Sequence, residues 1–361
     1  MVFRAIFLKA GIMGALLLGL PLFGIVLAGM PVGQYLEFPP ETRYVRHAPF
    51  SWLAFFCYTL FILAVTVPLT LKGLRALKRS RTGSDVSWPF PWWGWLSILL
   101  GLIAWVLAWT RFSWFARLQP YTFFPLWFSF IVFINSLNYR RYRHCIMLDR
   151  PKFFFLLFPL SSVFWWFFEY LNRFVQNWHY VGVHFSCWEY FWNATLCFST
   201  VLPAVISMRE FILGLPGFDE EFRYVIRLSF HRPRGLAWIA IILACLSLTL
   251  IGLYPDFLFP LLWISPLLII VSLQILIGDK HVLQDVVKGD WRLVVSSALA
   301  ALCCGWFWEM WNFYSFARWE YAVPFVHRFE VFKMPVLGFA GYLPFGLECA
   351  VVSDMLDSSV R

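Results

Sequence analysis

The chain is poor in charged residues, which make up only 14% of it, whereas apolar residues make up 61%. Soluble globular domains carry about 25% charged residues, so this composition excludes an ordinary soluble domain. The mean hydropathy is +0.70, and apolar runs of the roughly 20 residues needed to cross a bilayer recur along the chain. The sequence therefore predicts an all-α integral membrane protein.

Several motifs that carry chemistry are missing. There is no CxxC pair, and most of the eight cysteines lie within apolar runs, so no disulfide framework is expected. No histidine lies in the middle of such a run, which excludes paired axial ligands of a transmembrane haem. Walker loops, dinucleotide fingerprints and nucleophile elbows are also absent. The histidines near the chain's outer segments lack the helical spacing of zinc ligands. We therefore expect no cofactor and no metal.

Ten apolar runs are long enough, or nearly long enough, to span a membrane. The sixth and the tenth are the weakest. They are roughly Ala5–Met30, Phe50–Leu71, Trp93–Thr110, Thr122–Asn138, Phe153–Leu171, Phe191–Met208, Gly235–Leu253, Phe257–Gly278, Leu293–Trp311 and Pro335–Val352.

The positions of lysine and arginine predict the orientation, because positively charged loops stay on the cytoplasmic side. The basic segments KGLRALKRSR (72–81) and YRRYRHCIMLDRPK (139–152) follow the second and the fourth span, so both are cytoplasmic when both termini are cytoplasmic. The net charge of +9 is then explained by basic cytoplasmic loops, which anionic lipid headgroups attract. We therefore expect no nucleic-acid partner. The expected location is the plasma (inner) membrane.

The chain also contains an internal repeat. FFEYLN (167–172) resembles FWEMWN (307–312), NWHY (177–180) resembles RWEY (318–321), and a Leu-Pro pair recurs at 202–203 and 343–344. An even number of spans separates the copies, so both halves run the same way across the bilayer. We predict a two-helix unit (1–90) followed by two parallel four-helix repeats (91–234 and 235–361), with N-in and C-in topology.

Each repeat carries a glutamate close to the end of a span. Glu169 lies 17 residues after Lys152, and Glu309 lies 17 residues after Arg292. At about 1.5 Å per residue, both carboxylates reach the outer headgroup level. Asn172 and Asn312 follow three residues later, on the same helix face as the glutamates.

Aromatic residues surround these helix ends. The segments 172–192 and 312–334 are rich in Trp and Tyr, which favour the headgroup level, so we expect short interfacial helices or re-entrant turns there. Trp178, Tyr180, Trp319 and Tyr321 would cover the carboxylates. Another matched pair, Glu189 and Glu330, completes the candidate substrate-binding set with Asn172 and Asn312.

Two alternatives concern the carboxylates. Glu169 could be a structural residue that pairs with Arg173 four residues later. Glu348 lies well inside the last run, where the first half has Ser207, and a carboxylate at that depth indicates function. Glu309, Glu169 and Glu348 are therefore the candidate catalytic residues.

The function expected from these features is binding or chemistry on an amphiphilic lipid or isoprenoid at the outer leaflet. Glu169 or Glu309 would act as general acid or base, with the asparagines orienting it or the substrate. A proton- or cation-coupled transporter is the first alternative, because of the parallel repeat and Glu348. A non-catalytic subunit, partnered by other membrane subunits, is the second.

Overall fold

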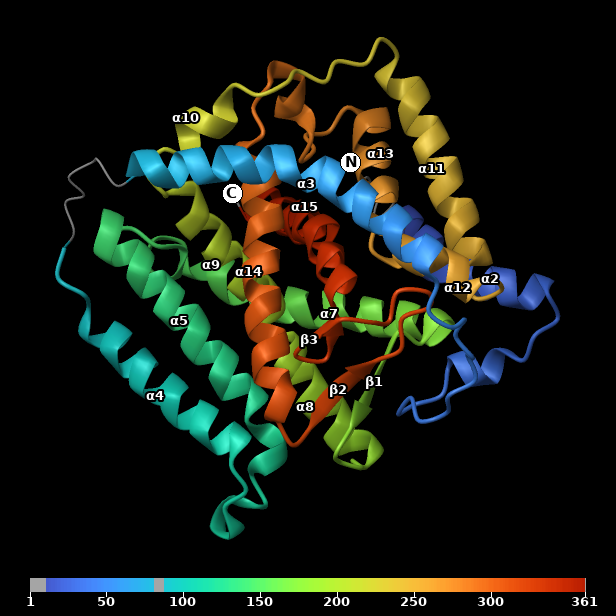
Figure 1. Cartoon of the computed structure of the whole chain (residues 1–361), viewed down its shortest axis with the longest axis horizontal. Coiled ribbons are helices and arrows are strands. Elements are labelled where there is room, and N and C mark those ends of the chain that lie inside the picture. The colour runs from blue at the N-terminus through green and yellow to red at the C-terminus, as the bar shows by residue number, and fades with distance from the viewer. Residues whose placement is uncertain (1–10, 81–87, 361) are drawn as a thin grey trace.

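The computed structural model describes residues 11–80 and 88–360, which fold into a helical bundle with very little strand (Figure 1). Among these residues, eight helices are long and apolar enough to cross a membrane. They are Trp52–Ala76 in α3 (Trp52–Ser80), α4 (Trp92–Trp109), Gln119–Tyr142 with α5 (Phe123–Tyr142), α7 (Pro151–Val175), Cys187–Leu213 with α8 (Cys187–Phe198) and α9 (Val201–Leu213), α11 (Pro233–Leu250), α14 (Arg292–Tyr314), and Val336–Ser359 with α15 (Tyr342–Val360). This architecture is that of a multi-pass helical membrane protein.

The eighth predicted run is bent. The segment Pro255–Leu262, which contains α12 (Pro255–Leu258), meets α13 (Ser265–Ile277) at an angle of 51°, and the two together would make a ninth span. Pro266 in the first turn of α13 explains the break, because proline has no N–H to donate to the preceding turn and its ring prevents a continuous helix. The first predicted run appears as the shorter apolar helix Gly11–Leu27, and its earlier residues lie outside the described ones. The count of ten spans therefore stays a prediction.

The helices pack in pairs. α4 packs against α5, and α11 packs against α13. α14 runs through the middle of the bundle, where it contacts α9 and α15 (Figure 1). Large aromatic side chains fill the interior: Trp127 is fully buried, and its ring centroid lies 4.8 Å from Trp308 and 5.2 Å from Trp311. The centre of the molecule is thus an aromatic core around α14.

A small β-ladder joins two distant parts of the chain. β1 (Trp178–Val181) pairs antiparallel with β2 (Arg318–Tyr321), so the expectation of interfacial helices or re-entrant turns at these positions was wrong. Successive side chains of a strand point to opposite faces. Trp178 and Tyr180 both bond to Glu169 of α7, whereas His179 between them lies opposite Glu320 in the ladder. A second ladder, β3 (Glu330–Val331) with β4 (Met334–Pro335), follows in the same loop.

The connections between helices gather at two ends of the bundle. At one end, Tyr44 donates its backbone N–H to Gln176, and Ser51 donates to Phe325, so the loop before α3 meets both strand-bearing loops. We call this the ladder end. At the other end, Trp88 donates to the carbonyl of Arg140, and Arg292 pairs with Asp219 of α10 (Phe218–Arg223). We call this the α10 end.

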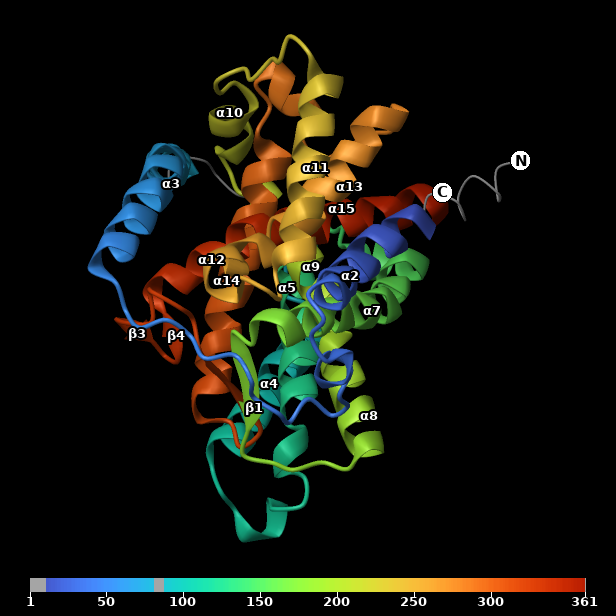
Figure 2. The ribbon, with the colours of Figure 1, turned by 90° about the vertical axis from the view of Figure 1, so that its right-hand side faces the viewer.

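α3 stands apart from the bundle (Figure 2). None of its most apolar stretch is buried. It contacts the rest of the chain mainly at α10 and at the 3₁₀ helix Val336–Gly341 (η7). Gly217, with φ of 77°, allows the first contact, because a Cβ there would lie 2.8 Å from the carbonyl oxygen of Ala76. α3 therefore crosses the face of the bundle with little packing beneath its centre.

Candidate functional site

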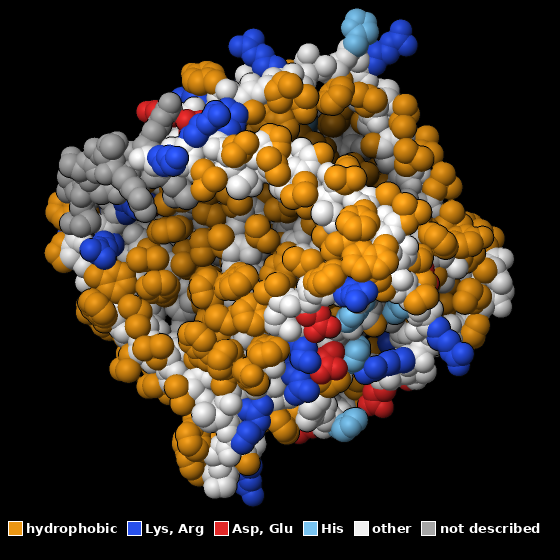
Figure 3. Space-filling view, viewed as in Figure 1, with side chains coloured by type: hydrophobic (Ala, Val, Ile, Leu, Met, Phe, Trp, Pro, Cys, Tyr) orange, Lys and Arg blue, Asp and Glu red, His pale blue; other side chains and the backbone are white. Residues whose placement is uncertain are grey.

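A cavity of about 1990 Å³ lies beneath α3. Its long walls are apolar side chains of α3, α14 and α15, among them Val65, Leu69, Leu302 and Leu347. Figure 3 shows that this face of the molecule is hollowed and mainly hydrophobic, with charged and histidine side chains near its upper and lower borders. Residues of β1 and β2 line the cavity at the ladder end. Such a volume matches a large apolar molecule or chain.

Glu169 lines the cavity and is held by three donors. The indole N–H groups of Trp165 and Trp178 donate to its Oε1, each at 3.0 Å, and the hydroxyl of Tyr180 donates to the same oxygen at 2.6 Å. Trp165 lies one turn earlier on α7, whereas the other two donors come from β1. The three bonds fix the carboxyl group at the ladder end of the cavity.

Asn172 and Asn312 connect the helix ends to the strands. The side-chain amide of Asn172 donates to the carbonyl of Trp178 at 2.8 Å, and its oxygen accepts from the backbone N–H of Asn177 at 2.9 Å. Asn312 donates to the carbonyl of Trp319 and accepts from its N–H, both at 2.8 Å. The two asparagines thus make equivalent bonds that begin β1 and β2.

Glu309 is fully buried and lies behind two tyrosines. The hydroxyls of Tyr321 and Tyr342 both donate to its Oε1 at 2.7 Å, and Trp319 donates its indole N–H to the Tyr321 hydroxyl at 2.8 Å. Its Oε2 accepts no hydrogen bond from the described residues. Tyr321 and Tyr342 line the cavity, so they are the groups through which Glu309 would act on a bound molecule.

Tyr342 is a site residue that sequence reasoning missed. Its ring occupies the space above Gly305, where an added Cβ would lie 2.4 Å from the ring. In the alignment of the two predicted repeats, Gly305 and Tyr342 correspond to Trp165 and Val201. Each glutamate therefore receives an aromatic donor, from its own helix in one half and from the neighbouring helix in the other. The exchange of a large and a small residue between matched positions was the available signal.

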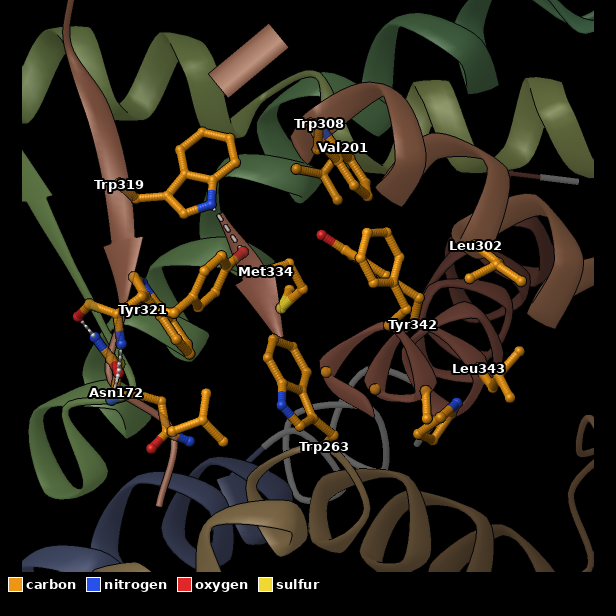
Figure 4. A pocket seen from close by; sticks show the side chains of 18 of the residues that line it. Asn172, Val201, Trp263, Leu302, Trp308, Trp319, Tyr321, Met334, Tyr342 and Leu343 are labelled. Atoms are coloured by element: carbon orange, nitrogen blue, oxygen red, sulfur yellow. Dashed lines mark hydrogen bonds between the residues drawn. The ribbon is translucent and has the colours of Figure 1, made fainter. Parts of the chain in front are cut away.

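Five aromatic side chains form the inner wall of the cavity around Glu169. We call this wall the aromatic chamber, and it consists of Trp263, Trp178, Trp165, Trp308 and Tyr342. In that order, successive ring centroids lie 5.8 to 6.5 Å apart. Figure 4 shows part of the cavity wall, with Tyr321 and Trp319 on one side, Tyr342 on the opposite side, Trp263 below and Met334 between them.

The remaining predicted residues lie elsewhere. Glu189 caps α8, where its carboxylate accepts the backbone N–H of Ser186. Glu330 pairs with His327 at 3.2 Å on the exposed β3, and neither glutamate lines the main cavity. Glu348 is buried, and neither of its carboxylate oxygens accepts a hydrogen bond from a described side chain. It does not line the cavity either.

Arg173 does not pair with Glu169. Its guanidinium donates to the carbonyl of Gln34 at 2.6 Å and to Glu37 at 3.1 Å, and it lies over the ring of Tyr44. The reading of Glu169 as half of an i, i+4 ion pair was therefore wrong, because the loop before α3 supplies a carboxylate that competes for the arginine.

The hydroxyls of the two ladder tyrosines donate to the glutamates. Burial raises the pKa of the Tyr180 and Tyr321 hydroxyls well above the usual value, and the adjacent glutamates raise it further. Within the described parts of the chain, no three His, Cys, Asp or Glu side chains converge as a metal site. The ladder end thus offers fixed hydroxyl and indole donors around two carboxyl groups.

Comparison with protein-family models, with curated proteins and with solved structures finds no match for this chain, so its function must be argued from the site itself.

Proposed function

We propose that the protein binds, or chemically modifies, an amphiphilic molecule of lipid or isoprenoid type at the outer leaflet. The observation that carries the proposal is the cavity beneath α3, whose long apolar walls end at an aromatic chamber with a carboxyl group. An apolar chain would occupy the space between α3 and α14, and the head of the molecule would lie beside Glu169. A ligand could enter from the bilayer past α3, because that helix packs weakly against the bundle.

Within this proposal, the two glutamates have different roles. Glu169 lines the cavity and would act on the ligand directly as general acid or base. Glu309 would act through the hydroxyls of Tyr321 and Tyr342, which it orients. Asn172 and Asn312 would position the strands rather than touch the ligand, since both their amide groups are bonded to backbone.

The proposed site lies on the axis of the proposed repeat. Trp178 matches Trp319, and Tyr180 matches Tyr321, both with an offset of 141 (319 − 178 and 321 − 180). The ladder pairs Trp178 with Tyr321 and Tyr180 with Trp319, so exchanging the two halves reproduces the same pairs. A parallel repeat with its twofold axis through the ladder accounts for this register. The equivalent packing of α4 on α5 and α11 on α13 supports it.

A proton- or cation-coupled transporter remains the second candidate. The bent pair Pro255–Leu262 and Ser265–Ile277 favours it, because transporters use interrupted helices at their binding sites. Buried Glu348 would be the coupling residue. The mainly apolar lining of the cavity favours the amphiphile over an ion or a small polar solute.

The test is retention of an endogenous molecule. Protein purified in a mild detergent should release a lipid or isoprenoid in about one copy per chain when it is denatured and analysed by mass spectrometry. Leu302→Trp, which fills the cavity, should abolish that retention. Leu99→Trp, on the exposed face of α4, is the matched control. Equal loss or equal retention in both variants would show that the retained molecule does not occupy this cavity, and it would contradict the proposal.

A further inference from the structure

The aromatic chamber has a chemical preference that its shape alone does not give. Four indole rings and one phenol ring surround a space that also contacts Glu169. Aromatic faces carry negative electrostatic potential, and a carboxylate adds to it. The chamber therefore attracts positive charge and disfavours anions.

In the described part of the chain, no arginine or lysine makes a hydrogen bond or ion pair with Glu169. Among the described residues, no arginine or lysine lies over any of the five chamber rings, whereas such contacts occur at other rings of the chain. Arg173, one turn from Glu169, is engaged by Glu37 and Gln34. Arg318, near the mouth of the cavity, pairs with Glu320 at 3.3 Å.

We propose that the aromatic chamber binds the cationic head of an amphiphile, of the quaternary ammonium class. The inference rests on the proposed function and narrows its ligand. A quaternary ammonium group donates no hydrogen bonds, which fits a chamber where Trp165, Trp178 and Tyr342 already direct their donors at the two glutamates. Aromatic cages beside a carboxylate recognise such groups through cation–π attraction. The apolar cavity would hold the chain attached to the head.

The experiment compares two probes on the full-length protein in a maltoside detergent. One is dodecyltrimethylammonium, and the other is its neutral isostere, in which a carbon atom replaces the nitrogen. Equilibrium dialysis with mass spectrometry measures binding of each. We expect the ammonium probe to bind at least about tenfold more tightly, as expected for one charge over several desolvated rings.

Variants identify the groups responsible. Glu169→Gln keeps the acceptor oxygen and removes the charge, and Trp263→Leu removes one face of the chamber. Each should reduce the preference for the ammonium probe to about threefold or less, while the neutral probe binds as before. Trp95→Leu on the exposed face of α4 and Asp285→Asn at the α10 end are the matched controls, and both should leave the preference unchanged.

The outcomes separate the two proposals. Equal binding of both probes at the cavity would overturn the cationic preference and leave amphiphile binding standing. Binding of neither probe, together with no endogenous ligand, would overturn both. A preference that survives Glu169→Gln and Trp263→Leu, in variants whose melting temperatures are unchanged, would place the ammonium site outside the aromatic chamber and overturn this inference.

Discussion

At the scale of residues, Glu309 is distinguished by where its donors come from. Two tyrosine hydroxyls donate to one carboxylate oxygen in a fully buried position. Glu309→Leu would leave both hydroxyls without an acceptor, and each such loss costs about 1–3 kcal/mol. Glu309→Gln retains one acceptor oxygen for them. We therefore expect a clearly lower melting temperature for the leucine variant than for the glutamine variant, measured in detergent. Equal melting temperatures would show that the tyrosine bonds contribute little.

Gly305 controls whether Tyr342 reaches Glu309. An alanine Cβ at this position would lie 2.4 Å from the tyrosine ring, so the ring must move away from the carboxylate. We expect Gly305→Ala to destabilise the protein by about 1–3 kcal/mol, as overpacking usually does. Gly101→Ala in α4 is the control, because its Cβ meets only Ser129 at 3.4 Å. Thermal unfolding of both variants checks this, and an equal effect would contradict the role of Gly305.

At the scale of elements, the closest contact that holds α3 over the cavity is the one between Gly217 and Ala76 beside α10. Gly217→Ala would strain a positive φ and would also clash with Ala76 of α3. Gly278→Ala strains a similar φ of 76° but meets nothing within 4 Å. We expect only Gly217→Ala to increase proteolysis of α3 and to reduce retention of a bound amphiphile, because only this variant displaces α3. If Gly278→Ala reduced amphiphile retention equally, backbone strain rather than displacement of α3 would be the cause.

The β-ladder should depend on pH through His179. Burial and nearby Arg43 lower the pKa of His179 below 6.5, and Glu320, itself bonded to Arg318, opposes them. The folded protein then binds fewer protons at this site than the unfolded chain. Its contribution to stability is present above pH 6.5 and is lost as the pH falls through the lowered value. The amide-exchange protection factors of residues 178–181, which correct for the intrinsic effect of pH on exchange, should fall over that range, and His179→Gln should remove the dependence.

The sequence predicted the class of fold and the surroundings of the glutamates better than the local backbone. Apolar runs identify membrane spans because bilayer thickness fixes their length. The preference of Trp and Tyr for the headgroup level predicts that Trp178 and Tyr321 cover the carboxylates, and both residues contact them. The strands were missed because four-residue segments form only when a distant partner is present, and β1 and β2 are about 140 residues apart.

Other parts of the site required three-dimensional information. The donation from Tyr342 depends on the packing of α15 against α14, and Arg173 pairs with Glu37, which is 136 residues away. Neither partner has a local sequence signal. The cavity results from the loose packing of α3. It was not predicted, because an apolar run has the same composition whether its helix packs against the bundle or stands apart.

At the scale of the whole molecule, the two ends of the bundle differ in charge. The α10 end collects the basic segment around Arg140 and Arg141, which contacts Trp88 and Gly214 from two other loops. Basic loops remain in the cytoplasm, so we predict that the α10 end is cytoplasmic and that the ladder end, with the mouth of the cavity, is outside.

Labelling with an impermeant thiol reagent tests this orientation in intact cells. The background should lack the exposed native cysteines Cys57, Cys187 and Cys303. A cysteine at Ser113, exposed in the loop between α4 and α5 at the ladder end, should react from outside. A cysteine at Ser229, equally exposed but beyond α10, should react only after the membrane is opened. The reverse pattern would place the ladder end in the cytoplasm, and the mouth of the cavity would then face the inner leaflet.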